Sequence, residues 1–157
     1  MVEMLFRCNI LALVGGGIHP KFPNNKVLLW DDNQQKCIGE LSYKSPVKNI
    51  KLRKDKIIVV LEERIYVYNF SDLRLVDAID TYINPKGLCS VSSDDQPILA
   101  YLEKDKKGTV RLTNYQTNKN TSIDAHNSGI SCMSLNFTGS LLATASDKGT
   151  IIKIFST

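Results

Sequence analysis

The residue types that most often bind metals or form covalent intermediates are sparse and scattered in this chain. The cysteines Cys8, Cys37, Cys89 and Cys132 are separated by 29, 52 and 43 residues, and the only histidines are His19 and His126. Zinc ligands usually occur in closely spaced pairs, so this spacing predicts neither a metal site nor a cofactor. Four scattered thiols instead indicate buried, reduced cysteines of a cytosolic protein.

The glycine and acidic clusters give no sign of catalysis. Gly15-Gly16-Gly17 could form a phosphate-binding loop, but the strand–loop–helix context that such a loop needs is missing, so we predict a turn between strands. Glu62-Glu63 and Asp94-Asp95 are predicted in turns or loops, and neither pair has a partner base or nucleophile. We therefore expect no enzymatic activity.

Basic residues are the remaining candidates for binding chemistry. The chain has 20 Lys and Arg against 16 Asp and Glu, and this net charge of +4 is too small to indicate nucleic-acid binding. One segment is locally basic and contains a single acid, Asp55. Its cations are Lys44, Lys48, Lys51, Arg53, Lys54 and Lys56. We interpret this segment either as a solvated strand face or as a surface that docks a partner protein.

The elements that must position these residues are short strands. Seven β-rich runs cover 10–14, 26–30, 57–61, 64–68, 109–112, 141–145 and 150–155, and turn-forming residues bound them. Runs of this length and spacing, with almost no helical periodicity, predict an all-β protein. The apolar run 10–14 is too short to cross a bilayer, so any membrane contact is expected to be peripheral.

The runs also repeat. KVLLWDD, IYVYNF, VRLTNY and IKIFST each continue from a β-rich run into a turn former. Their aligned residues Trp30, Tyr68, Thr113 and Phe155 are 38, 45 and 42 residues apart, which is the spacing of WD40 blades. In the last repeat, His126 and Asp147 hold the places of the structural hydrogen-bond network that is typical of such blades.

We therefore predict part of a WD40-type β-propeller over residues 1–157. Its blades are expected at about 2–45, 46–83, 86–125 and 126–157, with the last one incomplete. Propellers close as rings of about four to eight blades. Four blades are more typical of an arc than of a ring, so we expect the chain to be a piece of a longer protein.

Several segments match more than the general repeat. VEMLFRCNILALVGGG with PNNKVLLWDD, VKNIKLRKDKIIVVLEERIYVYNF, NPKGLC and ATASDKGTIIKIF resemble blades two to five of the PROPPIN family, in the family's order. The resemblance covers nearly the whole chain. It implies that these are about four blades of an expected seven. It also implies that the protein binds phosphatidylinositol 3-phosphate and phosphatidylinositol 3,5-bisphosphate at the propeller rim.

The resemblance further implies a lipid headgroup site in the last repeat. Carried over position by position, its residues are His126, Ser146, Lys148, Thr150 and Lys153. Hydroxyl, imidazole and ammonium groups suit a phosphate, because its oxygens accept hydrogen bonds. Lys153 stands where the family commonly has arginine and lacks its bidentate fork. The family's arginine pair would follow Thr157, so we expect the first lipid site to be incomplete here and the second to be missing.

The expected role is that of an adaptor without enzymatic activity that acts in autophagy and endolysosomal traffic. The resemblance implies a cytoplasmic protein that lies peripherally on autophagic, endosomal or vacuolar/lysosomal membranes and docks autophagy proteins on blades two and three. Two alternatives stay open. His126 can be only the network histidine of its blade, and the chain can be a generic WD40 protein-interaction scaffold without lipid binding.

Overall fold

The structure is a computed structural model that describes residues 1–157, and all of its regular elements are strands. The strands are β1 (Val2–Met4), β2 (Ile10–Val14), β3 (Lys26–Asp31), β4 (Lys36–Ser42), β5 (Asn49–Leu52), β6 (Lys56–Val60), β7 (Arg64–Asn69), β8 (Leu75–Asp80), β9 (Cys89–Val91), β10 (Ile98–Leu102), β11 (Thr109–Asn114), β12 (Lys119–Asp124), β13 (Ile130–Leu135), β14 (Leu141–Ser146) and β15 (Ile152–Ser156). The prediction of an all-β chain is confirmed. The structure holds no helix with the length and apolarity that crossing a membrane requires.

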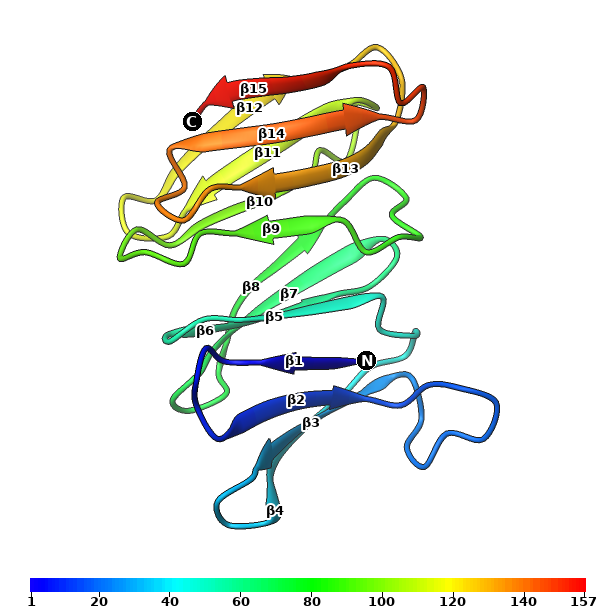
Figure 1. The fold of residues 1–157 in the computed structure, drawn as a ribbon, viewed down its shortest axis with the longest axis vertical. Coiled ribbons are helices and arrows are strands. Elements are labelled where there is room, and N and C mark those ends of the chain that lie inside the picture. Colours follow the sequence, from blue (N-terminus) through cyan, green and yellow to red (C-terminus); the bar gives the residue numbers. More distant parts are fainter. The chain divides into compact units, whose positions relative to one another are not determined.

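The strands form four sheets in which sequence neighbours are also spatial neighbours. The orders are β1-β2-β3-β4, β5-β6-β7-β8, β9-β10-β11-β12 and β13-β14-β15. The chain divides into two compact units, which we call the N-terminal unit (Met1–Ile79) and the C-terminal unit (Asp80–Thr157). Within the N-terminal unit β1 contacts β5, and within the C-terminal unit β9 contacts β13 (Figure 1).

The burial of each strand follows its sequence pattern. β2 alternates buried Ile10, Ala12 and Val14 with half-buried residues, as expected where the two faces of a sheet differ in exposure. β10 is a continuous apolar run that is buried along its whole length, Ile98–Leu102. The outer strand β12 is polar and largely exposed. Each sheet therefore buries its middle strands and leaves its outer strand to solvent.

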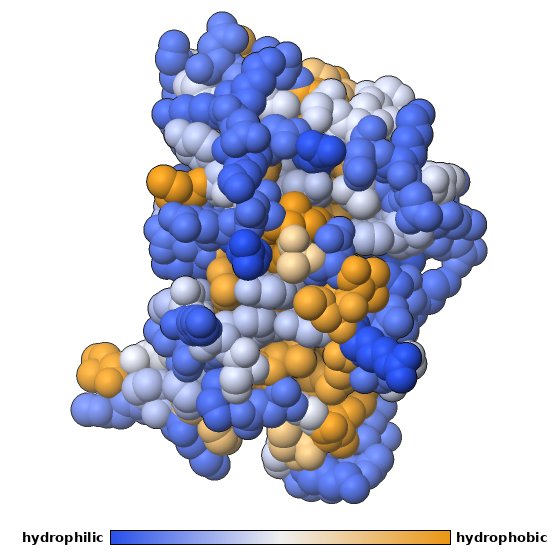
Figure 2. Space-filling model, turned by 180° about the vertical axis from the view of Figure 1, so that it is seen from behind, coloured by the Kyte–Doolittle hydropathy of each residue, from blue (hydrophilic) through white to orange (hydrophobic).

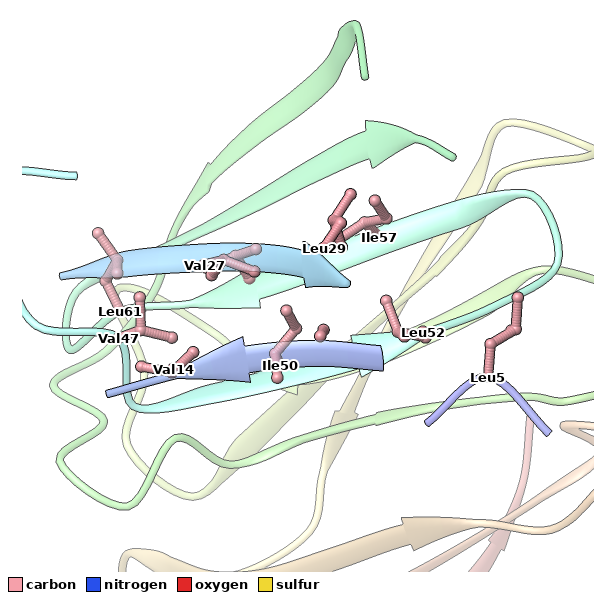
Figure 3. Packing of buried hydrophobic residues seen from close by; sticks show 11 residues of the cluster. Leu5, Val14, Val27, Leu29, Val47, Ile50, Leu52, Ile57 and Leu61 are labelled. Atoms are coloured by element: carbon pink, nitrogen blue, oxygen red, sulfur yellow. The ribbon is translucent and has the colours of Figure 1, made fainter. Parts of the chain in front are cut away.

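The core of the N-terminal unit lies between its two sheets. Figure 3 shows Val27 and Leu29 of β3 on one side and Ile50 of β5 and Ile57 of β6 on the other, with their side chains packed together. Val27, Ile50 and Ile57 are completely buried. Burying one such side chain contributes about 1.5–3 kcal/mol. This layer therefore joins the first sheet to the second.

The C-terminal unit has a matching core between its own two sheets. Ala100 of β10 and Val110 of β11 lie on one side, and Met133 of β13 and Leu142 of β14 on the other. On the last strand, Phe155 packs against this cluster. The same side of β14 and β15 that carries Leu142 and Phe155 also carries two of the candidate headgroup residues discussed below, Ser146 and Lys153.

The repeat inferred from sequence reappears in the backbone. Gln35, Leu73 and Asn118 have positive φ angles of 49°, 56° and 53° in the turns that follow β3, β7 and β11. They are 38 and 45 residues apart, the same intervals that separate Trp30, Tyr68 and Thr113 in the aligned runs. The three hairpins therefore turn at equivalent positions with the same left-handed residue.

Side-chain oxygens close two of these turns in the same way. Asp31 Oδ1 accepts hydrogen bonds from the amides of Asn33 and Gln34, at 2.9 and 3.2 Å. Asn114 Oδ1 accepts equivalent bonds from the amides two and three residues further on, also at 2.9 and 3.2 Å. Asp and Asn favour such turns because their short side chains reach the backbone amides that follow. The Asp of the Trp-Asp dipeptide thus has a structural role.

Apolar side chains remain exposed on some strands. Ile152 and Ile154 of β15 are 73% and 68% exposed, and Val2 and Met4 of β1 are also exposed. Figure 2, a view from behind, shows patches of apolar surface among the polar surface. Exposed apolar surface of this kind is typical of strands that pack against a further element.

The prediction of four buried cysteines is wrong for three of them. Only Cys89 is buried, whereas Cys8, Cys37 and Cys132 are exposed. Cys8 lies in the bend before β2, Cys37 on the outer strand β4, and Cys132 on an exposed position of β13. The burial of each cysteine depends on its place in the fold. The scattered spacing of the four cysteines in the sequence does not reveal that place.

Candidate functional site

Two parts of the last sheet supply the predicted headgroup residues. His126 lies just before β13, and the other four residues lie on β14, on β15 or in the hairpin turn between them. The turn is closed by a hydrogen bond of 3.0 Å from the Gly149 amide to the Ser146 carbonyl, and Gly149 has a φ of 67°. Glycine adopts this left-handed conformation without steric cost, which explains the Lys-Gly pair in the sequence.

The structure brings His126 and Lys153 together around Thr144. His126 Nε2 lies 3.0 Å from Thr144 Oγ1, and Thr144 is only 2% exposed. Thr144 pairs with Lys153 across the β14–β15 ladder, and Lys153 Nζ donates a hydrogen bond of 2.8 Å to the carbonyl of Ala125. Both candidate residues therefore make structural hydrogen bonds that hold the start of β13 against the hairpin.

The remaining candidates differ in exposure. Ser146 is buried and points to the same side of β14 as Thr144, two residues away. Lys148 and Thr150 are exposed in the turn. An exposed ammonium and an exposed hydroxyl in one turn are available to an anionic ligand that approaches from solvent, since each can donate hydrogen bonds to it. The turn therefore presents donors to solvent, whereas the donors at the sheet face are buried or already bonded to protein atoms.

Thr144 is the functional neighbour that the sequence-based site left out. The sequence could have indicated it, because the network typical of such blades includes a Ser or Thr beside the histidine, and Thr144 lies on the same side of β14 as Ser146. Asp147 lies against Gly129, and a Cβ at Gly129 would come within 2.3 Å of Asp147 Oδ2. The Asp147 amide also donates to the Gly129 carbonyl, at 2.9 Å. Asp147 therefore secures the turn against the loop that precedes β13.

The basic segment of the N-terminal unit is largely neutralised by acids. The ion pairs are Lys48–Glu62 at 3.2 Å, Lys51–Glu3 at 3.3 Å, Arg53–Asp55 at 2.6 Å and Lys56–Asp55 at 3.4 Å. Arg53 is 2% exposed, so the interpretation as a solvated strand face is wrong for this residue. Partial burial raises the pKa of the Asp55 carboxyl, but the hydrogen bonds and charges of Arg53 and Lys56 together outweigh it and hold that pKa below its usual range.

The glycine run has a structural role, and the potential metal ligands do not cluster. Gly15-Gly16-Gly17 lies in the connection between β2 and β3, as predicted, and a Cβ at Gly15 would clash with the Phe22 carbonyl oxygen at 1.6 Å. No group of three or more His, Cys, Asp or Glu residues in the chain is arranged to hold a metal ion. The last sheet with its turn is therefore the best candidate site for an anionic ligand.

Comparison with known proteins defines the class of protein. The chain superimposes on Hsv2 of Kluyveromyces marxianus with a TM-score of 0.83 and 28% identity, covering 100% of this chain and 48% of that one. It superimposes on KlAtg21, solved in complex with the coiled coil of AgAtg16, with a TM-score of 0.87 and 28% identity, covering 100% and 51%. The fold is a WD40-type β-propeller, of which this chain represents a part, as predicted.

Sequence comparison identifies the family. The PROPPIN family model matches residues 1–157, so the chain belongs to the PROPPIN family. It is 43% identical to Autophagy-related protein 18e of Arabidopsis thaliana over 99% of this chain and 42% of that protein. It is 41% identical to SVP1-like protein 2 of Neurospora crassa over 100% and 36%. The chain thus spans less than half the length of these two relatives.

Proposed function

We propose that this protein is a peripheral membrane adaptor that binds phosphatidylinositol 3-phosphate and phosphatidylinositol 3,5-bisphosphate and acts in autophagy and endolysosomal traffic. The observation that carries the proposal is the match to the PROPPIN family over residues 1–157. The adaptor has no catalytic step of its own. It lies in the cytoplasm and docks on autophagic, endosomal or vacuolar/lysosomal membranes.

The chemistry of the last hairpin supports headgroup binding. Lys148 supplies a cation and Thr150 a hydroxyl from an exposed turn, and a phosphate can accept a hydrogen bond from each. His126 and Lys153 already bond to protein atoms, so they act mainly by fixing the hairpin that presents this turn. Ser146 lies at the base of the same turn, where its carbonyl accepts the Gly149 amide.

A liposome flotation assay on the full-length protein tests this proposal. Vesicles with phosphatidylinositol 3-phosphate should bind the protein, whereas vesicles with unphosphorylated phosphatidylinositol should not. Lys148→Ala and Thr150→Ala should each weaken binding by roughly fivefold to a hundredfold, the range expected for losing one charged contact. Lys54→Ala, a charge removed from the N-terminal unit, is the matched control and should matter less.

Two results would contradict the proposal. Equal binding to both vesicle types would show a general attraction of cations to anionic lipid. No binding to either would favour the second candidate function, a WD40 scaffold that binds proteins alone. That candidate has its own support, because KlAtg21 was solved with a coiled-coil protein, AgAtg16. We propose that autophagy proteins also dock on this chain, on the blades that contain β1–β8.

A further inference from the structure

An open pocket in the C-terminal unit has no role in the proposed headgroup site. Its volume is about 350 Å³, and none of the five candidate headgroup residues lines it. Its walls come from the 82–88 loop, from the turn at 106–109 and from a segment that contains Gly129 and Ile130. Pockets that bind small ligands have volumes from roughly 300 Å³ upward.

The inner wall of the pocket is apolar. Leu102 and Ile130 are buried at its base, and Leu88 is partly buried beside them. Ile83 and Tyr82 line it and remain exposed, Ile83 to 57%. An exposed isoleucine that continues into a buried apolar wall gains stability if an apolar group covers it. The pocket therefore suits at least one apolar side chain.

The rim of the pocket is cationic. Lys86, Lys106 and Lys107 line it, and Asp147 is the one carboxylate among the lining residues. Lys86 Nζ donates to a neutral partner, the hydroxyl of Ser131, at 2.7 Å, so its charge is not neutralised there. Lys106 has an acid partner outside the pocket, Asp124, at 2.6 Å. The lining thus has more positive than negative charge, and this excess favours an acidic ligand.

The pocket is held in shape by backbone and amide hydrogen bonds. The buried side chain of Asn84 accepts from the amide of Leu88 at 2.7 Å and donates to the Leu88 carbonyl at 2.9 Å. On the other wall, the Gly108 carbonyl accepts the amides of Ala125 and His126 at 3.1 and 3.0 Å. A Cβ at Gly108 would lie 1.9 Å from the His126 carbonyl oxygen. A fixed site loses little conformational entropy on binding.

We propose that this pocket binds a short acidic peptide segment of a partner protein, which inserts one apolar side chain against Ile83 and Leu102. Carboxylates on either side of that side chain pair with Lys86 and Lys107. A membrane is a poorer occupant, because the apolar wall is recessed and a bilayer surface cannot enter it. The proposal does not depend on lipid binding, since the two sites share no proposed ligand-binding residue.

A displayed library of random short peptides, selected on the full chain, tests the proposal. The selected peptides should combine aspartate or glutamate with one leucine, isoleucine or aromatic residue. Fluorescence anisotropy should then show that Lys107→Glu and Ile83→Ser each weaken a selected peptide by roughly tenfold to a hundredfold. Raising the salt concentration should weaken binding to the wild-type chain, because exposed charges are screened.

The matched control is Lys104→Glu, which makes the same charge change at a lysine outside the pocket that pairs with Asp80 at 3.0 Å. It should weaken the peptide much less than Lys107→Glu does. Circular dichroism of the variants should match the wild type, since Ile83 and Lys107 are exposed. Lys148→Ala should leave peptide binding unchanged, so a failed lipid assay and a failed peptide assay are separate results.

Three outcomes would overturn the proposal. The first is a selection that yields no peptide, or peptides without acidic residues. The second is equal binding of the selected peptides to the wild type and to Lys107→Glu. The third is that Ile83→Ser and Lys107→Glu abolish binding to vesicles of phosphatidylcholine and phosphatidylserine while peptides are unaffected, which would assign the pocket to a lipid surface.

Discussion

The two units differ in how they balance their basic residues. In the N-terminal unit the basic segment meets acids, and one of its cations, Arg53, is buried in an ion pair with Asp55. In the C-terminal unit Lys104, Lys106 and Arg111 also pair with acids. Lys86 and Lys153 differ, because they bond to neutral oxygens at 2.7 and 2.8 Å, and Lys148 is exposed in a turn. A cation beside an acid is already neutralised, whereas a cation beside a hydroxyl or a carbonyl retains a net charge for an anionic ligand.

The comparison shows why the richest basic run in a sequence is a poor guide to a binding site. The acids that neutralise the run come partly from distant positions, since Glu3 of β1 reaches Lys51 of β5 across 48 residues. Glu62 follows β6, whereas its partner Lys48 precedes β5. Of the three lysines that line the pocket, Lys106 and Lys107 are adjacent in the sequence, whereas the fold brings Lys86 to them from 20 residues away. Folding, not local density, decides which charges remain available.

The largest expected effect comes from removing the buried cation. Arg53→Leu should lower the free energy of unfolding by about 1.5–3 kcal/mol, because the hydrogen bond to the Asp55 carboxylate is lost and only the longer ion pair of Asp55 with Lys56 remains. Lys107→Leu in the C-terminal unit should change it by no more than about 0.5 kcal/mol. Urea unfolding of the full chain, followed by circular dichroism, measures both. Similar losses for the two variants would contradict the distinction between the units.

A smaller loss should follow when the His126 contact is broken. Thr144→Val keeps the shape of the side chain but removes the hydroxyl 3.0 Å from His126 Nε2. Leaving a partly buried polar group without its partner should cost about 1–3 kcal/mol. Thr121→Val, on the exposed outer strand β12, is the control and should be nearly neutral. If Thr144→Val were equally neutral in urea unfolding, the hydrogen bond would not stabilise the hairpin.

Much of the fold could be predicted from the sequence because its signals are local. The runs 57–61 and 64–68 predict β6 and β7 through length and β-branched composition, and turn formers mark their ends. The intervals of 38 and 45 residues between aligned runs recur in the positive-φ residues of the turns. Strand period and repeat length depend on neighbouring residues, so a sequence shows them directly.

The candidate site could be predicted only in part. The repeat and the family resemblance assigned His126 and Lys153 to the same blade, and in the structure both lie around Thr144. The burial of Arg53 and the neutral partner of Lys86 depend on contacts between segments that no local pattern describes. Ser131, for example, lies 45 residues from Lys86 in the sequence.

Acid should unfold the N-terminal unit at a higher pH than the C-terminal unit. Asp31 and Glu40 of the N-terminal unit have pKa values below their usual range, mainly because of hydrogen bonds from Asn9 and Lys26 respectively, and the pKa of Asp55 is lowered as well. In the C-terminal unit Asp124 is the carboxyl with such a shift, caused first by Lys106 and then by Thr109.

These lowered pKa values make the folded protein less stable in acid. A carboxyl with a lowered pKa stabilises the folded state above its ordinary pKa, near 3.8–4.5, and that stabilisation is lost as the pH falls through the folded value. The single tryptophan, Trp30, reports on the N-terminal unit. Its fluorescence should therefore change at a higher pH than the circular dichroism of the whole chain. Coincident transitions would show that the two units unfold together.

The smallest expected effect tests whether the repeated turns are equivalent. Gln35 and Asn118 hold the same left-handed position in the two units. A left-handed residue other than glycine costs about 1–2 kcal/mol, less for asparagine, whereas glycine adds an entropy cost of about 0.5–1 kcal/mol. Gln35→Gly also removes two exposed hydrogen bonds from Gln35 Nε2 to Asp32, at 2.6 and 3.0 Å. It should thus raise the free energy of unfolding by no more than about 0.5 kcal/mol, and Asn118→Gly should leave it nearly unchanged. Gln35→Val should lower it, since β-branched residues fit this conformation poorly. A loss of stability in Gln35→Gly, measured by urea unfolding, would show that the Gln35 side chain supports its turn and that the two hairpins, although alike in backbone, are stabilised differently.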